Sequence, residues 1–533
     1  MSAAAQTTPA EADSPRLLPA APADAIPVRR LLAFLGMVFG MFMAILDIQI
    51  VSASLREIQA GLSASAEEIA WVQTSYLVAE VIMIPLSGYL SRAISTRVMF
   101  TIAAGGFTLA SLLCATATNI DEMIIYRAIQ GFIGGGMIPT VFASSFQIFP
   151  RSKQPLVAPM IGLVVTLAPT IGPTVGGYLT DLFSWHWLFL VNLVPGVIVT
   201  VMAWFLIDFD KAERHLLQDF DWLNLLSMAC FLGSLEYVLE EGAAKDWFAD
   251  DKIVIFALIT LVSAIVFFYR SFTSRQPIVD LRAYANSNFA LGSLFSFVMG
   301  IGLYGLTYLY PVYLGRVRGY SALQIGETMF LTGICMFLAA PVVGRLMTRI
   351  DPRIMMAIGF TGFSLGTWLA SAITKDWAFG ELVLPQIFRG TSLMMCMVPI
   401  NNLALGTLPP DRLKNASGLY NLTRNLGGAV GLALINTLMN DRWDLHLARL
   451  SEAVSWGMPT AEERLALMTQ RFSDLGSDAG AAATAQMLAM VKQQALVMAL
   501  GDVFFALTAI FILLIVMVPL MRRPAARPQP AKA

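Results

Sequence analysis

Two apolar runs contain unusual residues. The first reads Tyr126-Arg127-Ala128-Ile129-Gln130-Gly131 and continues with Gly134-Gly135-Gly136. The second reads Ala168-Pro169-Thr170-Ile171-Gly172-Pro173 and continues with Gly176-Gly177. A guanidinium costs roughly 2.5–3.5 kcal/mol at the centre of a membrane-inserted helix, so it should face a protein interior or a water-filled cavity. Glycine and proline at this density would break a helix in water, whereas membrane helices tolerate them because neighbouring helices satisfy the backbone. The two runs therefore predict a membrane helix bundle that moves and handles charge.

The composition excludes an ordinary soluble protein. Of 533 residues, 57% are hydrophobic without counting 40 glycines, only 13% are charged, and the mean hydropathy is +0.67. Soluble chains carry about 25% charged residues, so we expect an all-α integral membrane protein. A net charge of −1 disfavours a nucleic-acid-binding protein, which would have a basic face. The absence of a Gly-x4-Gly-Lys-Ser/Thr pattern disfavours an ATP-driven pump.

The cysteines and histidines predict neither a metal site nor a cofactor. Each cysteine lies in an apolar run, so we expect the four to be small buried hydrophobic residues. The three histidines are scattered at segment ends without the spacing of metal ligands. The four cysteines are Cys114, Cys230, Cys335 and Cys396, and the histidines are His186, His215 and His446.

Apolar runs of membrane-spanning length recur along the chain. A hydrocarbon core of about 30 Å takes about 20 residues of helix, and by this measure we expect fourteen transmembrane helices. They are 31–54, 70–91, 98–118, 122–147, 156–179, 186–207, 221–240, 252–272, 288–314, 322–345, 354–374, 379–402, 415–439 and 497–521.

The distribution of Lys and Arg predicts the orientation. If the N-terminus is cytoplasmic, the inside segments hold 21 Lys and Arg residues and the short outside loops hold 6. Basic residues accumulate on the cytoplasmic side, so both termini are predicted to be cytoplasmic. Residues 1–30 are rich in Ala and Pro, which predicts a disordered tail. No apolar core precedes Arg29, so we expect no cleaved signal peptide and a first helix that stays as an anchor.

A weak internal repeat predicts two similar halves. Gly88-Tyr89-Leu90-Ser91-Arg92 follows the second predicted helix, and Gly344-Arg345-Leu346-Met347-Thr348-Arg349 follows the tenth. Arg127 in the fourth helix likewise has a counterpart in Arg389. The predicted layout is a six-helix bundle (31–207), two inserted helices (208–282) and a second six-helix bundle (283–533). The segment 440–496 is helical in pattern but too polar to span, so we expect an external helical hairpin, either a partner-docking surface or a simple cap.

Charged residues inside the predicted spans are the candidate functional groups. Asp47 lies deep in the first helix with no basic residue within a helical turn, and Glu80 lies in the middle of the second. Burial disfavours an ionised carboxylate unless another helix supplies a cation. Each therefore either exchanges a proton or binds a cation, or forms a salt bridge that only holds the bundle together. Arg127 is either their modulating partner or a structural clamp. Glu236 lies on an inserted helix, where we expect it to be away from the central cavity.

These motifs resemble one transporter family. Arg127-x-x-Gln130-Gly131 resembles the fourth-helix motif of the major facilitator superfamily, and the spaced prolines and glycines from Pro169 to Gly177 resemble its fifth-helix antiporter motif. Leu46-Asp47-x-x-Ile50-Val51 and Arg424-Asn425-Leu426-Gly427-Gly428 are similar to stretches of the fourteen-helix drug:proton antiporters of the EmrB/QacA type. One departure is Ser91, which stands where superfamily members usually carry an acidic residue.

The resemblance implies a major facilitator fold and proton-coupled efflux of hydrophobic or amphipathic compounds across the inner membrane. The proton motive force would replace any cofactor, and the partners implied are a periplasmic membrane-fusion adaptor and an outer-membrane channel. The candidate residues are Asp47, Glu80 and Arg127 for proton coupling, Gln73, Tyr76, Gln130 and Arg424 for substrate binding, and Pro169, Gly172, Pro173, Gly176 and Gly177 for gating.

Three alternatives stay open beside efflux of many compounds. The first is a proton-coupled transporter of one defined metabolite, such as a siderophore or a fatty acid. The second is a membrane enzyme acting on lipid, which would need a nucleophile, base or metal set clustered at one membrane face, and the sequence contains no such cluster. The third is a channel, which the half-repeat and the antiporter-like glycines disfavour because they suit a rocking motion.

Overall fold

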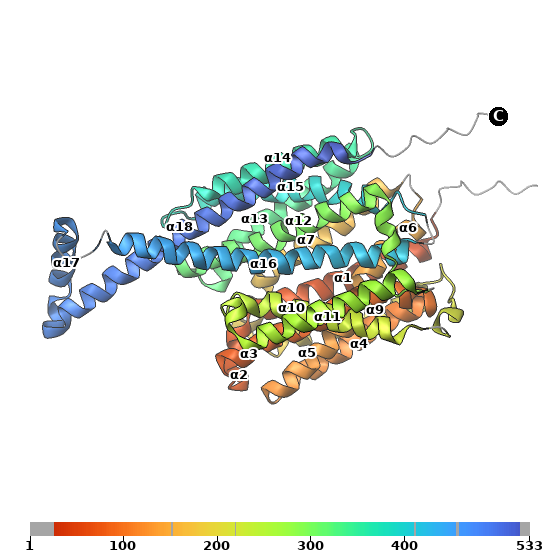
Figure 1. Cartoon of the computed structure of the whole chain (residues 1–533), viewed down its shortest axis with the longest axis horizontal. Helices are drawn as coiled ribbons and strands as arrows, with labels where there is room; N and C mark the ends of the chain where they lie inside the picture. The colour runs from red at the N-terminus through yellow and green to blue at the C-terminus, as the bar shows by residue number, and fades with distance from the viewer. Residues whose placement is uncertain are drawn as a thin grey trace, which may run out of the picture.

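A computed structural model of the chain describes residues 26–522, apart from residues 151, 152, 219, 275, 410, 411, 453 and 455–457. Every regular element in this part of the chain is a helix, and the long helices run roughly side by side (Figure 1). The predicted tail over residues 1–30 lies almost wholly outside the described residues. Among the described residues, twelve helical stretches are long and apolar enough to cross a membrane.

The helices of the first half begin with α1 and end with α9. Their bounds are α1 Val28–Ala53, α2 Leu55–Leu62, α3 Ala66–Ala93, α4 Thr96–Ala115, α5 Ile120–Gly134, α6 Met137–Ile148, α7 Gln154–Leu182, α8 Trp187–Leu190 and α9 Leu193–Leu206. Within this half α1 packs against α7 and α9, and α3 packs against α5.

The inserted pair and the second half follow. Their bounds are α10 Trp222–Gly242, α11 Asp251–Thr273, α12 Ser287–Val312, α13 Ala322–Leu346, α14 Pro352–Ser371, α15 Phe379–Leu405, α16 Leu413–Glu452, α17 Pro459–Arg471 and α18 Ala479–Met517. A π-helical turn continues α12, and short 3-10 turns lie at Arg214–Leu217, Trp247–Ala249, Leu281–Ala285, Ser473–Asp478 and Val518–Leu520. The two halves meet where α7 lies along α13 and where α3 and α6 pack on α16.

Two of the fourteen expected spans are not among the twelve apolar stretches. The span expected over 122–147 is divided at Gly135–Gly136 into α5 and α6, each shorter than a full crossing. The span expected over 415–439 lies within α16, whose Asn421, Arg424 and Asn425 lower its hydropathy. The count of fourteen therefore stays a prediction.

The inserted pair of helices lies across the contact between the halves, because α10 packs on both α3 and α16. Asp221 caps the first turn of α10 through the backbone N–H of Asn224, and its carboxylate accepts a hydrogen bond from Arg270 at 2.8 Å. Partial burial opposes the charge of Asp221, yet the Arg270 and Asn224 hydrogen bonds prevail and lower its pKa below the usual 3.8. This ion pair fastens α10 to α11 at one end.

The far ends of α16 and α18 project beyond the bundle with α17 beside them, at the left of Figure 1. They occupy most of the segment for which an external hairpin was expected. The last predicted span, 497–521, therefore belongs to a longer helix that already begins at Ala479.

The expectation of four buried cysteines is wrong for Cys230, which is exposed, and only partly right for Cys335, which is half-buried. Cys114 and Cys396 are buried. An apolar run has the same composition on its protein-facing and outer faces, so composition could not separate these cases.

Candidate functional site

Asp47 lies at the centre of a hydrogen-bond network that joins four helical segments. Its Oδ2 accepts from Arg127 Nη1 at 2.6 Å, and its Oδ1 accepts from Asn192 Nδ2 at 2.8 Å and Gln130 Nε2 at 3.2 Å. Gln130 also donates to Ser111 of α4 at 2.9 Å. Asp47, Arg127 and Gln130 are fully buried. Protonation of Asp47 would weaken three interactions, so proton uptake there would rearrange the packing of α1, α5 and α9.

Arg127 is held on several sides. Its Nη1 donates to Gln130 Oε1 at 2.7 Å as well as to Asp47, and its Nε donates to the Val72 carbonyl of α3 at 3.2 Å. The ring of Tyr76 lies 4.2 Å from the guanidinium carbon, close enough for a cation–π interaction. The Nη2 group and the Tyr76 hydroxyl are buried without a hydrogen-bond partner. The network therefore has spare donors that a rearranged state could use.

Two local features of the sequence bring this network together. Gly131 lets α5 approach α3 so closely that a Cβ there would overlap the Tyr76 carbonyl oxygen. The helix expected over 186–207 is interrupted after α8, and Asn192 lies at this interruption as the residue before α9. A break in the helix thus aims the Asn192 amide at Asp47.

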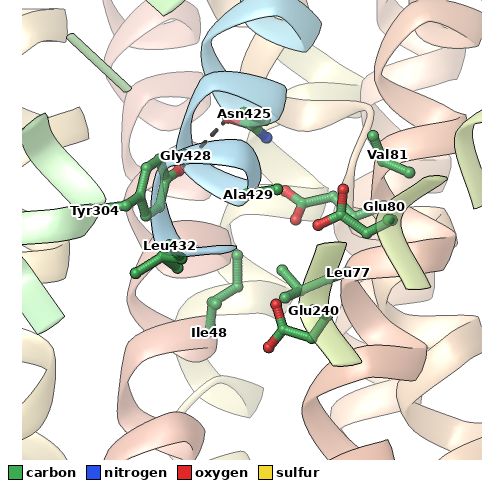
Figure 2. A pocket seen from close by; sticks show the side chains of 11 residues that line it. Ile48, Leu77, Glu80, Val81, Glu240, Tyr304, Asn425, Gly428, Ala429 and Leu432 are labelled. Carbon is green, nitrogen blue, oxygen red and sulfur yellow. Dashed lines mark hydrogen bonds between the residues drawn. The ribbon is translucent and has the colours of Figure 1, made fainter. Parts of the chain in front are cut away.

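A small cavity lies beside the network, between α3, α10, α12 and α16. Glu80, Glu236 and Glu240 line it together with Tyr304 and Asn425. Figure 2 shows the carboxyl groups of Glu80 and Glu240 and the ring of Tyr304 around this space. Ile48, the residue after Asp47, also lines the cavity, so the ion pair and the cavity are neighbours.

The expectation that Glu236 lies away from the central cavity is wrong. It assumed that inserted helices lie outside the two bundles, whereas α10 packs on both α3 and α16. Glu236 therefore reaches the same cavity as Glu80. Glu240, one helical turn later, was not singled out from the sequence.

The predicted substrate-binding residues lie near the cavity but are not in its wall. Tyr76 and Gln130 belong to the Asp47 network. Gln73 is half-buried, and its Oε1 atom is buried without a hydrogen-bond partner. Arg424 is buried on α16, 5.5 Å from the ring of Phe142. Its positive charge attracts the Glu80 carboxylate electrostatically, without a direct contact. Their roles in substrate binding stay predictions.

The second half repeats the position of Arg127 but not its chemistry. Arg389 on α15 is buried and donates to the Thr307 hydroxyl of α12 at 2.8 Å. Across the part of the chain that the structure describes, no carboxylate lies within ion-pair distance of Arg389. The buried ion pair of the first half therefore has no counterpart at Arg389.

The antiporter-like motif lies on α7 between the two halves. Pro169 and Pro173 are accommodated inside this helix. A Cβ at Gly172 would overlap Gln49 of α1, and one at Gly176 would lie 2.9 Å from the Ile50 carbonyl oxygen. Gly177 is buried. The glycines thus bring α7 close to α1 within the first half, while α7 also lies along α13 of the second half.

A second ion pair joins the halves at the end of the bundle where α16 begins. Lys414 Nζ donates to Asp210 Oδ2 at 2.6 Å and to the Ser91 carbonyl at 2.9 Å. The same Asp210 oxygen accepts from the backbone N–H and the hydroxyl of Thr96, both at 2.7 Å. Asp210 thus supplies a carboxylate beside Ser91, the position where the superfamily usually has an acidic residue.

Comparisons with known proteins agree with this architecture. The model of the Major Facilitator Superfamily matches residues 37–432. The chain is 43% identical to the colistin resistance protein EmrB of Acinetobacter baumannii over 90% of this chain and 93% of that one. It is 28% identical to the multidrug export protein EmrB of Escherichia coli K12 over 91% and 93%. The proton:xylose symporter XylE has a similar fold, with a TM-score of 0.58 at 13% identity over 93% and 96% of the two chains.

The all-helical fold and these similarities define a multi-pass membrane transporter rather than an enzyme. The chain belongs to the major facilitator superfamily, within which it is of the EmrB type.

Proposed function

We propose that the protein exports hydrophobic and amphipathic compounds of many kinds from the cell in exchange for protons. The carrying observation is a fully buried Asp47–Arg127 ion pair beside a carboxylate-lined cavity at the contact between the two halves. Ionisable groups inside a membrane protein typically mark ion or substrate pathways. The names of the EmrB relatives support export of several compounds.

The geometry supports a simple order of events. Proton binding to Asp47 would release Arg127 and Gln130, and the freed donors would change how α1 and α5 pack. Because α1 also contacts the glycine motif of α7, this change would reach the contact with the second half. A proton that moves inward gains about 2.3 kcal/mol per 100 mV of membrane potential, which drives the return step.

The membrane, the topology and the partners of the protein belong to the same proposal. We place the protein in the inner membrane with fourteen spans and both termini in the cytoplasm, supported by the Lys and Arg distribution. A periplasmic membrane-fusion adaptor and an outer-membrane channel are the proposed partners, and the projecting ends of α16 and α18 with α17 are the part of the chain available to them.

A panel of chemically unrelated fluorescent dyes tests this function in cells that lack their own efflux pumps. We expect the protein to lower the accumulation of several dyes, and collapse of the proton gradient with an ionophore should restore accumulation. A transporter of one defined metabolite, such as a siderophore or a fatty acid, would change at most one of them. Undiminished efflux after collapse of the gradient would contradict proton coupling.

A further inference from the structure

The turn between the inserted helices α10 and α11 contacts the second half through Trp247. Its Nε1 donates to the Thr437 hydroxyl of α16 at 2.9 Å. An indole N–H can only donate, and the Thr437 hydroxyl itself donates to the Ala433 carbonyl at 2.9 Å, so both groups of this contact are satisfied. Within the described part of the chain, it is the only hydrogen bond between the α10–α11 pair and the second half.

The inserted pair is attached more broadly to the first half. Trp71 of α3 stacks on Tyr237 of α10 with ring centroids 5.3 Å apart. Thr74, on the next turn of α3, donates to Glu241 at 3.4 Å. Trp247 packs against the same apolar cluster as Trp71. We therefore expect α10 and α11 to move with the first half.

The turn that carries Trp247 has a strained backbone. Asp246 and Trp247 have φ angles of 50° and 55°, a region that residues with side chains rarely adopt. A Cβ at Gly242 would lie 2.7 Å from the Trp247 ring, so the ring packs where only a glycine leaves room. Strained backbone persists where surrounding contacts hold it, and it is common in segments that switch. The turn thus fixes the indole in the direction of α16.

The Trp247 contact and the Lys414–Asp210 pair lie near opposite ends of the bundle on the same helix, α16. At 1.5 Å per residue, Lys414 and Thr437 are about 35 Å apart, slightly more than the hydrocarbon core of a membrane, which is about 30 Å thick. Halves that alternate must open at one end while the other stays closed. The two contacts are therefore placed to be broken in turn.

We propose that the Trp247–Thr437 hydrogen bond holds the inserted pair and the second half together at one end of the bundle and breaks when that end opens. The inference rests on the proposed export function, in which the halves move. It gives the inserted pair of helices a part in that movement, as the carrier of a releasable contact.

Double electron–electron resonance on the purified full-length protein in lipid nanodiscs measures the opening of each end separately. The four cysteines are first replaced by serine. Spin labels at Glu67→Cys and Lys375→Cys then report the distance between the halves at the Thr437 end. Labels at Arg97→Cys and Arg349→Cys report the opposite end, and all four labelled positions are exposed.

Trp247→Phe keeps the ring packed against Gly242 and removes only the N–H donor. We expect it to raise the population with the longer distance at the Thr437 end about fivefold, the effect of losing one ordinary hydrogen bond. The distance at the opposite end should not change. Thr437→Val should have the same effect, and the double variant should add little because both substitutions remove one bond.

Two controls keep the features that matter. Thr437→Ser keeps the hydroxyl and should behave like the original chain. Trp222→Phe makes the same substitution at an exposed indole where α10 begins, and it should leave both distances unchanged. Thermal unfolding of each variant checks that it is folded.

The outcomes separate this inference from the proposed function. Lengthening confined to the Thr437 end in Trp247→Phe and Thr437→Val would support the contact, and if such a protein exports no dye, only the export function fails. Unchanged distances in both variants, equal lengthening at both ends, or the same lengthening in Trp222→Phe would overturn the inference even if several dyes are exported.

Discussion

The ion pair of Asp47 and Arg127 places two full charges where both side chains are completely buried. Such a pair gains little over an apolar packing of the same shape, but removal of one partner leaves an uncompensated charge. The pair is therefore weak evidence for a stabilising role, even though the loss of either partner alone would be costly. A substitution can remove either charge of the pair without the other, so the contribution of each residue can be measured separately.

Arg127→Gln is expected to destabilise the protein by about 3–5 kcal/mol, because the Asp47 carboxylate would stay buried without its cation. The double variant with Asp47→Asn should recover much of this loss, since both charges are then absent. Thermal unfolding in detergent measures both effects, with Arg389→Gln as the control because that guanidinium has no carboxylate partner among the described residues. A single variant as stable as the original chain would show that the pair is not buried as described.

Single residues could be predicted from the sequence where a full charge stands in an apolar run, as for Asp47, Glu80 and Arg127. Asn192 and Ser111 could not, because a neutral polar side chain is common in membrane helices and gives no comparable signal. Glu236 was found but misplaced, because its depth depends on where α10 packs. That packing is a tertiary property that the sequence pattern does not contain.

At the scale of elements, the close contact of α3 and α5 positions the whole site. Val72, Tyr76 and Glu80 lie on α3, while Arg127 and Gln130 lie on α5. Helix association in membranes depends on small residues that let backbones approach. The glycines of α5 were recognisable in the sequence, but the break at Gly135–Gly136 and the interruption before α9 were not, because each lies inside an otherwise continuous apolar run.

Gly131→Ala should push α3 away from α5, because the added Cβ would overlap the Tyr76 carbonyl oxygen. Overpacking of this kind costs about 1–3 kcal/mol, and it should also lower transport by displacing Arg127 from Asp47. Thermal unfolding and dye efflux measure the two effects. Gly380→Ala is the matched control, since nothing lies within 4 Å of a Cβ there. Equal effects of the two substitutions would contradict the packing described.

At the scale of the whole molecule, the Lys414–Asp210 ion pair holds the two halves together at the end of the bundle where α16 begins. Ser91 stands where superfamily members usually carry an acidic residue, and the structure places a carboxylate from beyond α9, that of Asp210, in the same area. The sequence could not reveal this substitution, because Asp210 is far from Ser91 along the chain. The half-repeat was similarly incomplete, since Arg389 repeats the position of Arg127 without its acidic partner.

Lys414→Met is expected to open this end of the bundle more often. The reporter is Ser417→Cys in a chain whose four cysteines are replaced by serine, because Ser417 is buried and donates to the Pro139 carbonyl across the contact. Loss of about 1.4 kcal/mol of closing energy would raise the labelling rate by a maleimide about tenfold. Lys245→Met removes a half-buried pair within α10 and the turn after it, away from this end of the bundle, and serves as the control. An unchanged labelling rate in Lys414→Met would show that this ion pair does not hold the halves together.

The central claim is that a buried carboxylate in the first half exchanges a proton as the two halves move, and substrate-triggered proton release in proteoliposomes tests it most directly. The original chain should release protons when an exported dye is added, and Asp47→Asn should release none at equal protein content. Equal proton release by the two proteins would remove Asp47 from the coupling mechanism.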